Sequence, residues 1–175
     1  MALPGKMKSG RLLLLAALWC GGAAAQQNPI TTFIHDALAK HSKGIVAAAA
    51  QMPADKYDLK GPPDQVTFAY LVYHIADGNY LFCSVIGGVP VPKLPELGDS
   101  DPKDKLVERL KLSFDFCTGA LAKLDDSRMS ETLTAGEYKT SRAMAILTLA
   151  GNLATHLSQE ESYLQLAGLP PGQKK

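Results

Sequence analysis

The sequence lacks a charge excess of either sign, strand-like patterning and internal repeats. Its 175 residues contain 18 lysines and arginines against 17 aspartates and glutamates, for a formal net charge of +1. This balance provides no basic surface for a phosphate backbone, so we expect no nucleic-acid partner. Alternating β-branched residues, which are typical of strands, are also missing. Because one domain normally takes roughly 100–200 residues, the chain has room for a single soluble domain.

Long hydrophobic runs are also absent. The run over residues 12–19 falls well short of the roughly 20 residues of a membrane-spanning helix. Basic residues precede it and small residues follow it, which is the pattern of a secretory signal. We therefore predict a signal peptide over residues 1–25 and an exported, periplasmic domain over residues 26–175, with no membrane attachment after cleavage. An N-terminal anchor or a buried helix is the alternative. The bulky Trp19 disfavours lipid attachment at Cys20.

Helical spacing is present instead of strand patterning. Apolar residues recur at steps of three and four in four segments, which we predict to be helices over about 30–52, 65–86, 102–124 and 139–166. Asp64 is the expected N-cap of the second helix, and Pro102 the expected first residue of the third. Glu160 and Glu161 are interpreted as part of a solvated face.

The predicted connections differ in length. Residues 53–64 and the polar residues 125–138 are expected to be loops, and residues 87–102 hold four prolines and three glycines. This third stretch is long enough to be a crossover between the second and third helices. The sequence therefore predicts an all-α fold, a four-helix bundle with one long crossover.

Two cysteines remain in the predicted mature domain, Cys83 and Cys117. The long crossover lets the second and third helices run parallel, which places both cysteines toward the same end of the bundle. In an oxidising compartment they are expected to form a disulfide, with two buried thiols as the alternative. Neither lies in a C-x-x-C motif, which disfavours a redox role.

Polar residues on apolar helix faces are the candidate site, because bundles build ligand sites from such groups. His74 lies on the predicted inward face of the second helix with Leu71 and Leu81. Asn152 and His156 are four residues apart on the fourth helix, so they lie one turn apart on the same face. This spacing suits two ligands of one ion, but an inward histidine is also common as a hydrogen-bonded core residue.

The chain resembles the DinB/YfiT-like family of four-helix bundles, a damage-inducible family of metalloenzymes. The resemblance covers residues 30–171 and rests on two stretches, QMPADKYDLKGPPDQVTFAYLVYHIADGNY and the closing HLSQEESYLQLAGLPP, which is similar to the family's YLRxxGxxPP. It implies a divalent metal held by three histidines, one on the second helix and two spaced H-x-x-x-H on the fourth. These positions correspond to His74, Asn152 and His156. The chain departs from the family pattern at Asn152.

The resemblance implies a divalent ion such as Zn, Ni or Fe. The neutral amide of Asn152 weakens the expected binding of this ion, and Asp77 is a further candidate ligand. It implies a metal-dependent hydrolase, or a transferase acting on a thiol, with an unknown small-molecule substrate. A metal-free member that binds a small ligand or serves as a structural module is the alternative. A homodimer is also possible in sequence terms, because an apolar helix face has the same pattern whether it packs within one chain or between two.

Overall fold

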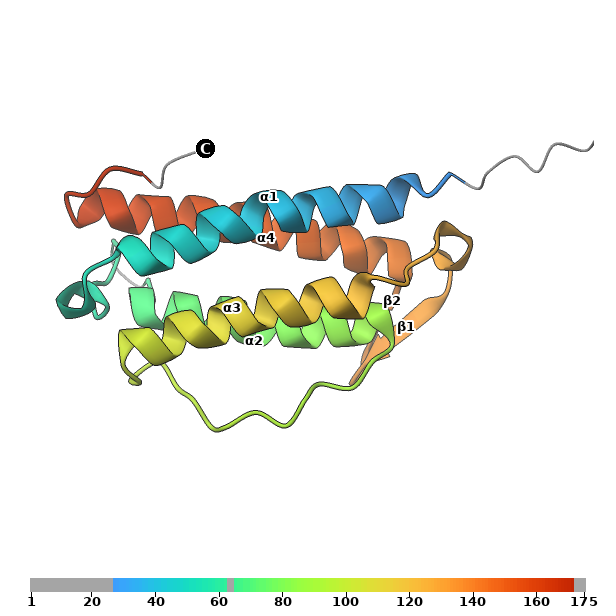
Figure 1. Cartoon of the computed structure of the whole chain (residues 1–175), viewed down its shortest axis with the longest axis horizontal. Coiled ribbons are helices and arrows are strands. Elements are labelled where there is room, and N and C mark those ends of the chain that lie inside the picture. Colours follow the sequence, from blue (N-terminus) through green and yellow to red (C-terminus); the bar gives the residue numbers. More distant parts are fainter. Residues whose placement is uncertain (1–26, 63–64, 172–175) are drawn as a thin grey trace, which may run out of the picture.

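The four amphipathic segments fold as helices: α1 (Pro29–Gln51), α2 (Phe68–Gly87), α3 (Lys103–Leu121) and α4 (Arg142–Leu166) (Figure 1). The computed structural model describes residues 27–62 and 65–171. The predicted four-helix bundle is confirmed. The predicted signal peptide over residues 1–25 and the predicted N-cap Asp64 lie outside the described residues.

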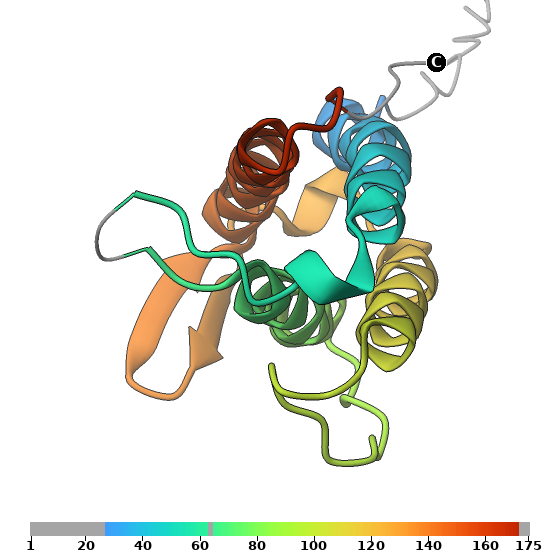
Figure 2. The same ribbon diagram turned by 90° about the vertical axis from the view of Figure 1, so that its left-hand side faces the viewer.

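The crossover sets the direction of the helices. Residues 88–102 run back along the outside of the bundle, so α2 and α3 are parallel to each other and antiparallel to α1 and α4 (Figure 1). The end-on view in Figure 2 shows the four helices around one core. Over residues 27–62 and 65–171, no helix combines the length and apolarity that crossing a membrane requires.

The helical spacing places most of the predicted core correctly in α1, α3 and α4. The side chains from these helices that are predicted to point inward and are buried in the structure are Ile34, Leu38, Ile45, Ala48, Leu106, Leu110, Phe114, Cys117, Leu121, Ile146, Ala150, Leu153 and Leu164. Together with α2 they form one continuous apolar cluster. Burying such side chains is the main favourable contribution to folding.

The predicted inward face of α2 is partly wrong. His74 is exposed and Leu81 is 54% exposed. The buried side instead carries residues such as Val72, Ile75 and Cys83, together with Leu71, for which the prediction is correct. Apolar residues lie on nearly all sides of α2, so periodicity alone cannot locate the face that packs against the core.

The prediction that residues 125–138 form a plain loop is also wrong. The stretch begins with a short 3-10 turn (Asp126–Arg128) and continues as an antiparallel hairpin of β1 (Thr132–Ala135) and β2 (Tyr138–Ser141). Gly136 has φ 61°, a value that favours glycine and suits a two-residue hairpin turn. The signal is present in the sequence, since threonines alternate with apolar residues before Gly136. Each strand has only four residues, which is too short for the alternation to be recognised in the sequence.

The starts of α2 and α4 differ from the predicted ones by a few residues, and the side chains of Thr67 and Ser141 supply their caps. Thr67 is the N-cap of α2, and its hydroxyl accepts a hydrogen bond from the Tyr70 N–H at 3.1 Å. Ser141 caps α4 in the same way, accepting from Met144 N–H at 3.2 Å. The residues just before Ser141 belong to β2, which delays α4 to residue 142. Pro102 is the N-cap of α3 rather than its first residue.

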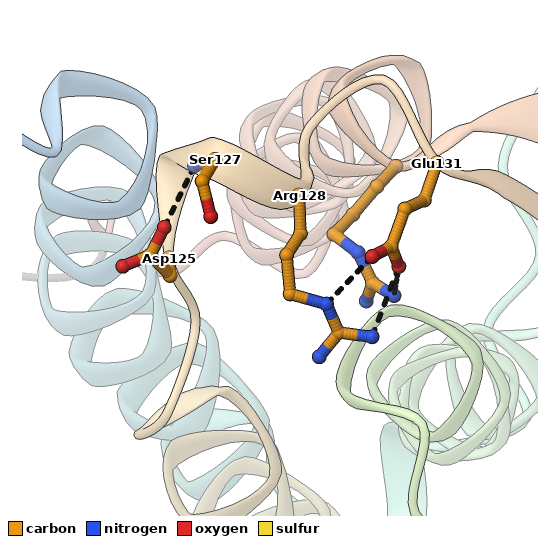
Figure 3. Close-up of polar contacts among 5 residues, drawn as sticks. Asp125, Ser127, Arg128 and Glu131 are labelled. Carbon is orange, nitrogen blue, oxygen red and sulfur yellow. Dashed lines mark hydrogen bonds and ion pairs between the residues drawn. The ribbon is translucent and has the colours of Figure 1, made fainter.

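A charged cluster fixes the start of α4 beside the hairpin. Arg128 donates two hydrogen bonds to the Glu131 carboxylate, at 2.8 and 2.9 Å (Figure 3). The buried Arg142 donates a third at 2.9 Å. In the preceding turn, the Asp125 carboxylate accepts from the Ser127 N–H at 2.7 Å (Figure 3). The paired guanidinium groups of Arg128 and Arg142 lower the pKa of Glu131 to about 2.

This cluster predicts a loss of stability in acid. The Glu131 pKa falls from 4.5 to about 2 on folding. The ionised side chain therefore contributes fully to the free energy of unfolding above the unfolded pKa, and this contribution is lost as the pH falls through the folded pKa. We expect the Glu131→Gln variant to show a flatter fall in melting temperature over this window than the unmodified protein. Glu137→Gln, at the exposed turn of the hairpin, is the control. Equal acid sensitivity in all three proteins would contradict the prediction.

The two cysteines meet in the structure. Cys83 of α2 and Cys117 of α3 form a disulfide with Cα atoms 5.1 Å apart, which confirms the expected pairing. One turn further along α2, a Cβ added to Gly87 would lie 2.4 Å from the carbonyl oxygen of Ala120. A glycine is therefore needed for α2 and α3 to approach this closely beside the disulfide.

Candidate functional site

A hollow of about 230 Å³ lies between α2 and α4, and it brings the predicted site residues together. His74 and Asp77 line it from α2, and Asn152 and His156 line it from α4. The antiparallel packing of α2 against α4 achieves this, because it places the middle of one helix opposite the middle of the other. Periodicity predicts His74 in the core, whereas the structure places it at the edge of this hollow.

The two histidine rings lie next to each other across the hollow. Their centroids are 5.4 Å apart and their planes meet at 83°, an edge-to-face arrangement. On its other side His74 stacks against Tyr70, with centroids 5.9 Å apart and planes at 8°. Tyr70 and His74 are one turn apart on α2, so the helix itself sets this stacking. The tyrosine limits the orientations available to the His74 ring.

The second histidine has its proton placed by a neighbour on the same helix. His156 Nδ1 lies 2.8 Å from Oε1 of Gln159. Because an amide oxygen only accepts hydrogen bonds, Nδ1 carries the hydrogen and Nε2 keeps its lone pair. Burial lowers the pKa of His156; the Gln159 hydrogen bond opposes this, and the nearby His74 adds to it. Burial and His74 therefore favour the neutral imidazole of His156, whose unprotonated Nε2 has the lone pair that a metal ligand needs.

The donor set suits a weak metal site. Two imidazoles are suitable ligands for Zn²⁺ and similar ions, and fixing Nδ1 by a second residue is common at metal centres. The third candidate donor, Asn152, offers a neutral amide oxygen. No three side chains of the His, Cys, Asp and Glu types are grouped to hold a metal ion within residues 27–62 and 65–171. Asp77 lines the hollow but does not complete such a group with the two histidines.

Sequence reasoning misses one residue that contacts the site, Gln159, and misjudges the environment of another on the same helix, Glu160. Gln159 is not singled out by any motif, although its spacing of three from His156 points to it. Glu160 is predicted to be solvated, but it is fully buried and neither carboxylate oxygen has a hydrogen-bond partner. Its neighbour Glu161 is half-buried. The pattern that could have shown this is the spacing of seven between Leu153 and Glu160, which places both on one helix face.

Solved structures share this architecture. A DinB-like protein from Bacillus cereus superposes with a TM-score of 0.66 at 12% identity, over 81% of this chain and 95% of that one. A DinB-like protein from Bacillus subtilis gives a TM-score of 0.65 at 18% identity, over 85% of this chain and all of that one. A mycothiol-dependent maleylpyruvate isomerase gives a TM-score of 0.57 at 11% identity, over 74% of this chain and 58% of that one. At these identities the similarity shows the fold.

Sequence comparison identifies the family. No curated protein sequence matches the chain. The sequence model of the DinB superfamily matches residues 37–159, which include His74, Asn152 and His156. This match covers most of the chain and agrees with the resemblance seen in its sequence motifs. The chain belongs to the DinB superfamily.

Proposed function

We propose that His74 and His156 hold a divalent metal ion, with Asn152 as a weaker third donor, and that the centre serves a hydrolase or transferase reaction on a small molecule. The observation that carries this proposal is the pair of imidazoles, one from α2 and one from α4, with centroids 5.4 Å apart in the same hollow. Zn²⁺, Ni²⁺ and Fe²⁺ are the candidate ions, since imidazole suits all three.

The residues of the chain have separate tasks in this proposal. Gln159 orients His156 and keeps its Nε2 unprotonated, and Tyr70 supports the His74 ring. Asn152 contributes a neutral amide oxygen, which carries no negative charge to attract the ion. A bound divalent ion would lower the pKa of a water or thiol that reaches it toward about 7, which supplies a nucleophile at neutral pH.

The composition of the donor set favours a second candidate, a metal-free module that binds a small ligand in the same hollow. Asn152 replaces the histidine that the family pattern places there, and the remaining donors do not form a group of three among the described residues. Position 152 therefore separates the two candidates experimentally.

Metal binding should depend on both histidines and improve when position 152 is changed. We expect His74→Ala and His156→Ala to weaken Zn²⁺ binding at least tenfold, and Asn152→His to strengthen it by about tenfold or more, because imidazole is the better ligand. Elemental analysis and Zn²⁺ titration of the purified proteins measure both effects.

His35→Ala is a matched control for this titration, since His35 lies outside the hollow and approaches the Leu121 carbonyl oxygen. It should bind Zn²⁺ like the unmodified protein. If Zn²⁺, Ni²⁺ and Fe²⁺ all fail to bind both the unmodified protein and Asn152→His, the metal proposal is wrong and the ligand-binding module is favoured.

We also propose that the protein is exported and works in the periplasm. The paired Cys83 and Cys117 support this, because disulfides persist in oxidising compartments. Export favours a hydrolase over a thiol transferase, since small thiols are kept inside the cell. Thiol labelling of the protein from periplasmic and cytoplasmic fractions tests the proposal. The expected result is a shortened, unlabelled chain in the periplasmic fraction, and a full-length, labelled chain in the cytoplasm would contradict it.

A further inference from the structure

A second hollow continues from the candidate site toward the hairpin. It has a volume of about 280 Å³ and lies between α2, the start of α4, and the two strands. Leu81 and Phe82 line both this hollow and the one that holds the histidines. Figure 2 shows the hairpin on the outside of the bundle, beside α2 and α4. We call this second hollow the hairpin groove.

The hairpin groove differs chemically from the histidine end. Its walls are formed mainly by apolar side chains, including Val85, Leu133 and Tyr138, and none of its lining residues is an aspartate, glutamate, lysine, arginine or histidine. Two of its large apolar side chains are solvent-exposed, Leu81 at 54% and Tyr138 at 63%. Water contact with such side chains is unfavourable, so a ligand that covers them gains binding energy.

The two hollows are adjacent, since Leu81 and Phe82 line both, and together they offer a polar end and an apolar end. Along α2, a rise of ~1.5 Å per residue separates His74 from Val85 by roughly 16 Å, which is long enough for a medium-length aliphatic chain. Each hollow alone is small for a ligand pocket, but together they reach the usual range of about 300–1,000 Å³. A small compound with a polar head and an unbranched apolar tail fits this shape and polarity.

We infer that the substrate is a small acyl compound, with its carbonyl or carboxyl head between His74 and His156 and its aliphatic chain in the hairpin groove. This inference rests on the proposed function for the head group, whereas the groove is an independent observation. It also gives the hairpin a role, since β1 and β2 supply the outer wall that the helices lack.

Titration with decanoate and butanoate tests the inference. Both acids carry the same head group, and only decanoate is long enough to enter the hairpin groove. We expect decanoate to bind the protein at least tenfold more tightly than butanoate, since each buried methylene group contributes to binding. Isothermal titration should be run on metal-free protein and again with Zn²⁺ added.

Two threonines offer a matched pair of variants. Thr148 lines the groove, and its hydroxyl donates to the Met144 carbonyl oxygen at 2.9 Å within α4. Thr118 makes the same type of bond to the Phe114 carbonyl oxygen, at 3.0 Å, on α3 and away from the groove. Thr148→Trp fills the groove and should weaken decanoate binding at least tenfold while leaving butanoate and Zn²⁺ binding unchanged. Thr118→Trp should match the unmodified protein.

Circular dichroism verifies that each variant is folded. If Thr148→Trp does not fold, Tyr138→Ser removes an exposed wall of the groove and should also weaken decanoate binding. Equal affinity for the two acids, or decanoate binding that neither groove variant changes, would overturn the inference. So would a dimer in sedimentation that Thr148→Trp dissociates, because a second copy of the chain would then cover the groove.

The two proposals fail in different ways. Zn²⁺ binding without any preference for decanoate overturns the acyl inference and leaves the metal proposal in place. Decanoate binding that depends on Thr148, in a protein that binds none of Zn²⁺, Ni²⁺ and Fe²⁺ even as Asn152→His, supports the groove as the chain-binding end and overturns the metal proposal.

Discussion

Removing the Cys83–Cys117 disulfide is expected to lower the free energy of unfolding by about 3.5–4 kcal/mol. The bond joins residues 34 positions apart, and closing a loop of that length restricts the unfolded chain much more than the folded one. The double variant Cys83→Ala/Cys117→Ala should therefore unfold at a lower denaturant concentration. Chemical denaturation followed by circular dichroism measures the difference.

The unmodified protein after reduction is the control for this experiment. It keeps both sulfur atoms in the core but loses the covalent bond, so it separates the crosslink from the packing of the side chains. We expect the reduced protein to lose most of the same stability. If reduction and the double substitution each cost less than about 1 kcal/mol, the disulfide does not contribute as argued.

Replacing Glu160 with leucine is expected to stabilise the protein by about 1–3 kcal/mol at pH 8, because a buried polar group without a partner costs about that much. The side chain is fully buried, and both carboxylate oxygens lack a hydrogen-bond partner. Burial raises the pKa of Glu160 well above its usual 4.5. The negative charge is therefore far more costly in the folded protein than in the unfolded chain.

The sign of the pH dependence follows from this shift. A carboxyl group whose pKa is raised by folding stabilises the folded protein fully below its unfolded pKa of 4.5. This stabilisation is lost as the pH rises toward the folded-state pKa. The unmodified protein should thus lose stability between mildly acidic and alkaline pH. Glu160→Gln, which cannot ionise, should remove this loss.

Glu161→Gln is the control, since Glu161 is adjacent on the same helix and only half-buried. Melting temperatures between pH 5 and pH 9 compare the three proteins. A parallel decline in Glu160→Gln and the unmodified protein would show that another group causes the effect.

Glu160 and Glu131 act in opposite directions, and this separates their effects. The Glu131 carboxylate is stabilised by two arginines and contributes at neutral pH. The Glu160 carboxyl has no such partner and contributes in acid. Stability should therefore be greatest in the mildly acidic range between the two transitions.

Much of the architecture follows from the sequence. Local patterns determine the helices, because the spacing of apolar residues and the positions of prolines act within a few turns of the chain. The prolines and glycines of residues 87–102 mark the crossover, and the crossover predicts that α2 and α3 are parallel. Parallel helices place Cys83 and Cys117 toward the same end of the bundle, but the sequence leaves a disulfide and two buried thiols as alternatives, and the structure pairs the two cysteines.

The site is identified only in part from the sequence. The apolar surroundings of His74 and the i,i+4 spacing of Asn152 and His156 indicate the three candidates, and the family resemblance groups them into one site. Neither source shows that Gln159 fixes the proton of His156, since that contact depends on side-chain conformations in the folded protein. The burial of Glu160 is only weakly indicated, by its spacing of seven from Leu153, because a charged residue on a mixed helix face resembles a solvated one.

For α2, the tertiary structure alone decided which side faces the other helices. Apolar residues surround α2, so its sequence is compatible with several packing faces, and only contact with α3 and α4 selects one. That choice exposes His74 at the edge of a hollow and leaves Leu81 uncovered beside the hairpin. Helix positions are set by interactions a few residues apart, whereas pockets are formed by residues distant in sequence, and packing energy is what brings those residues together.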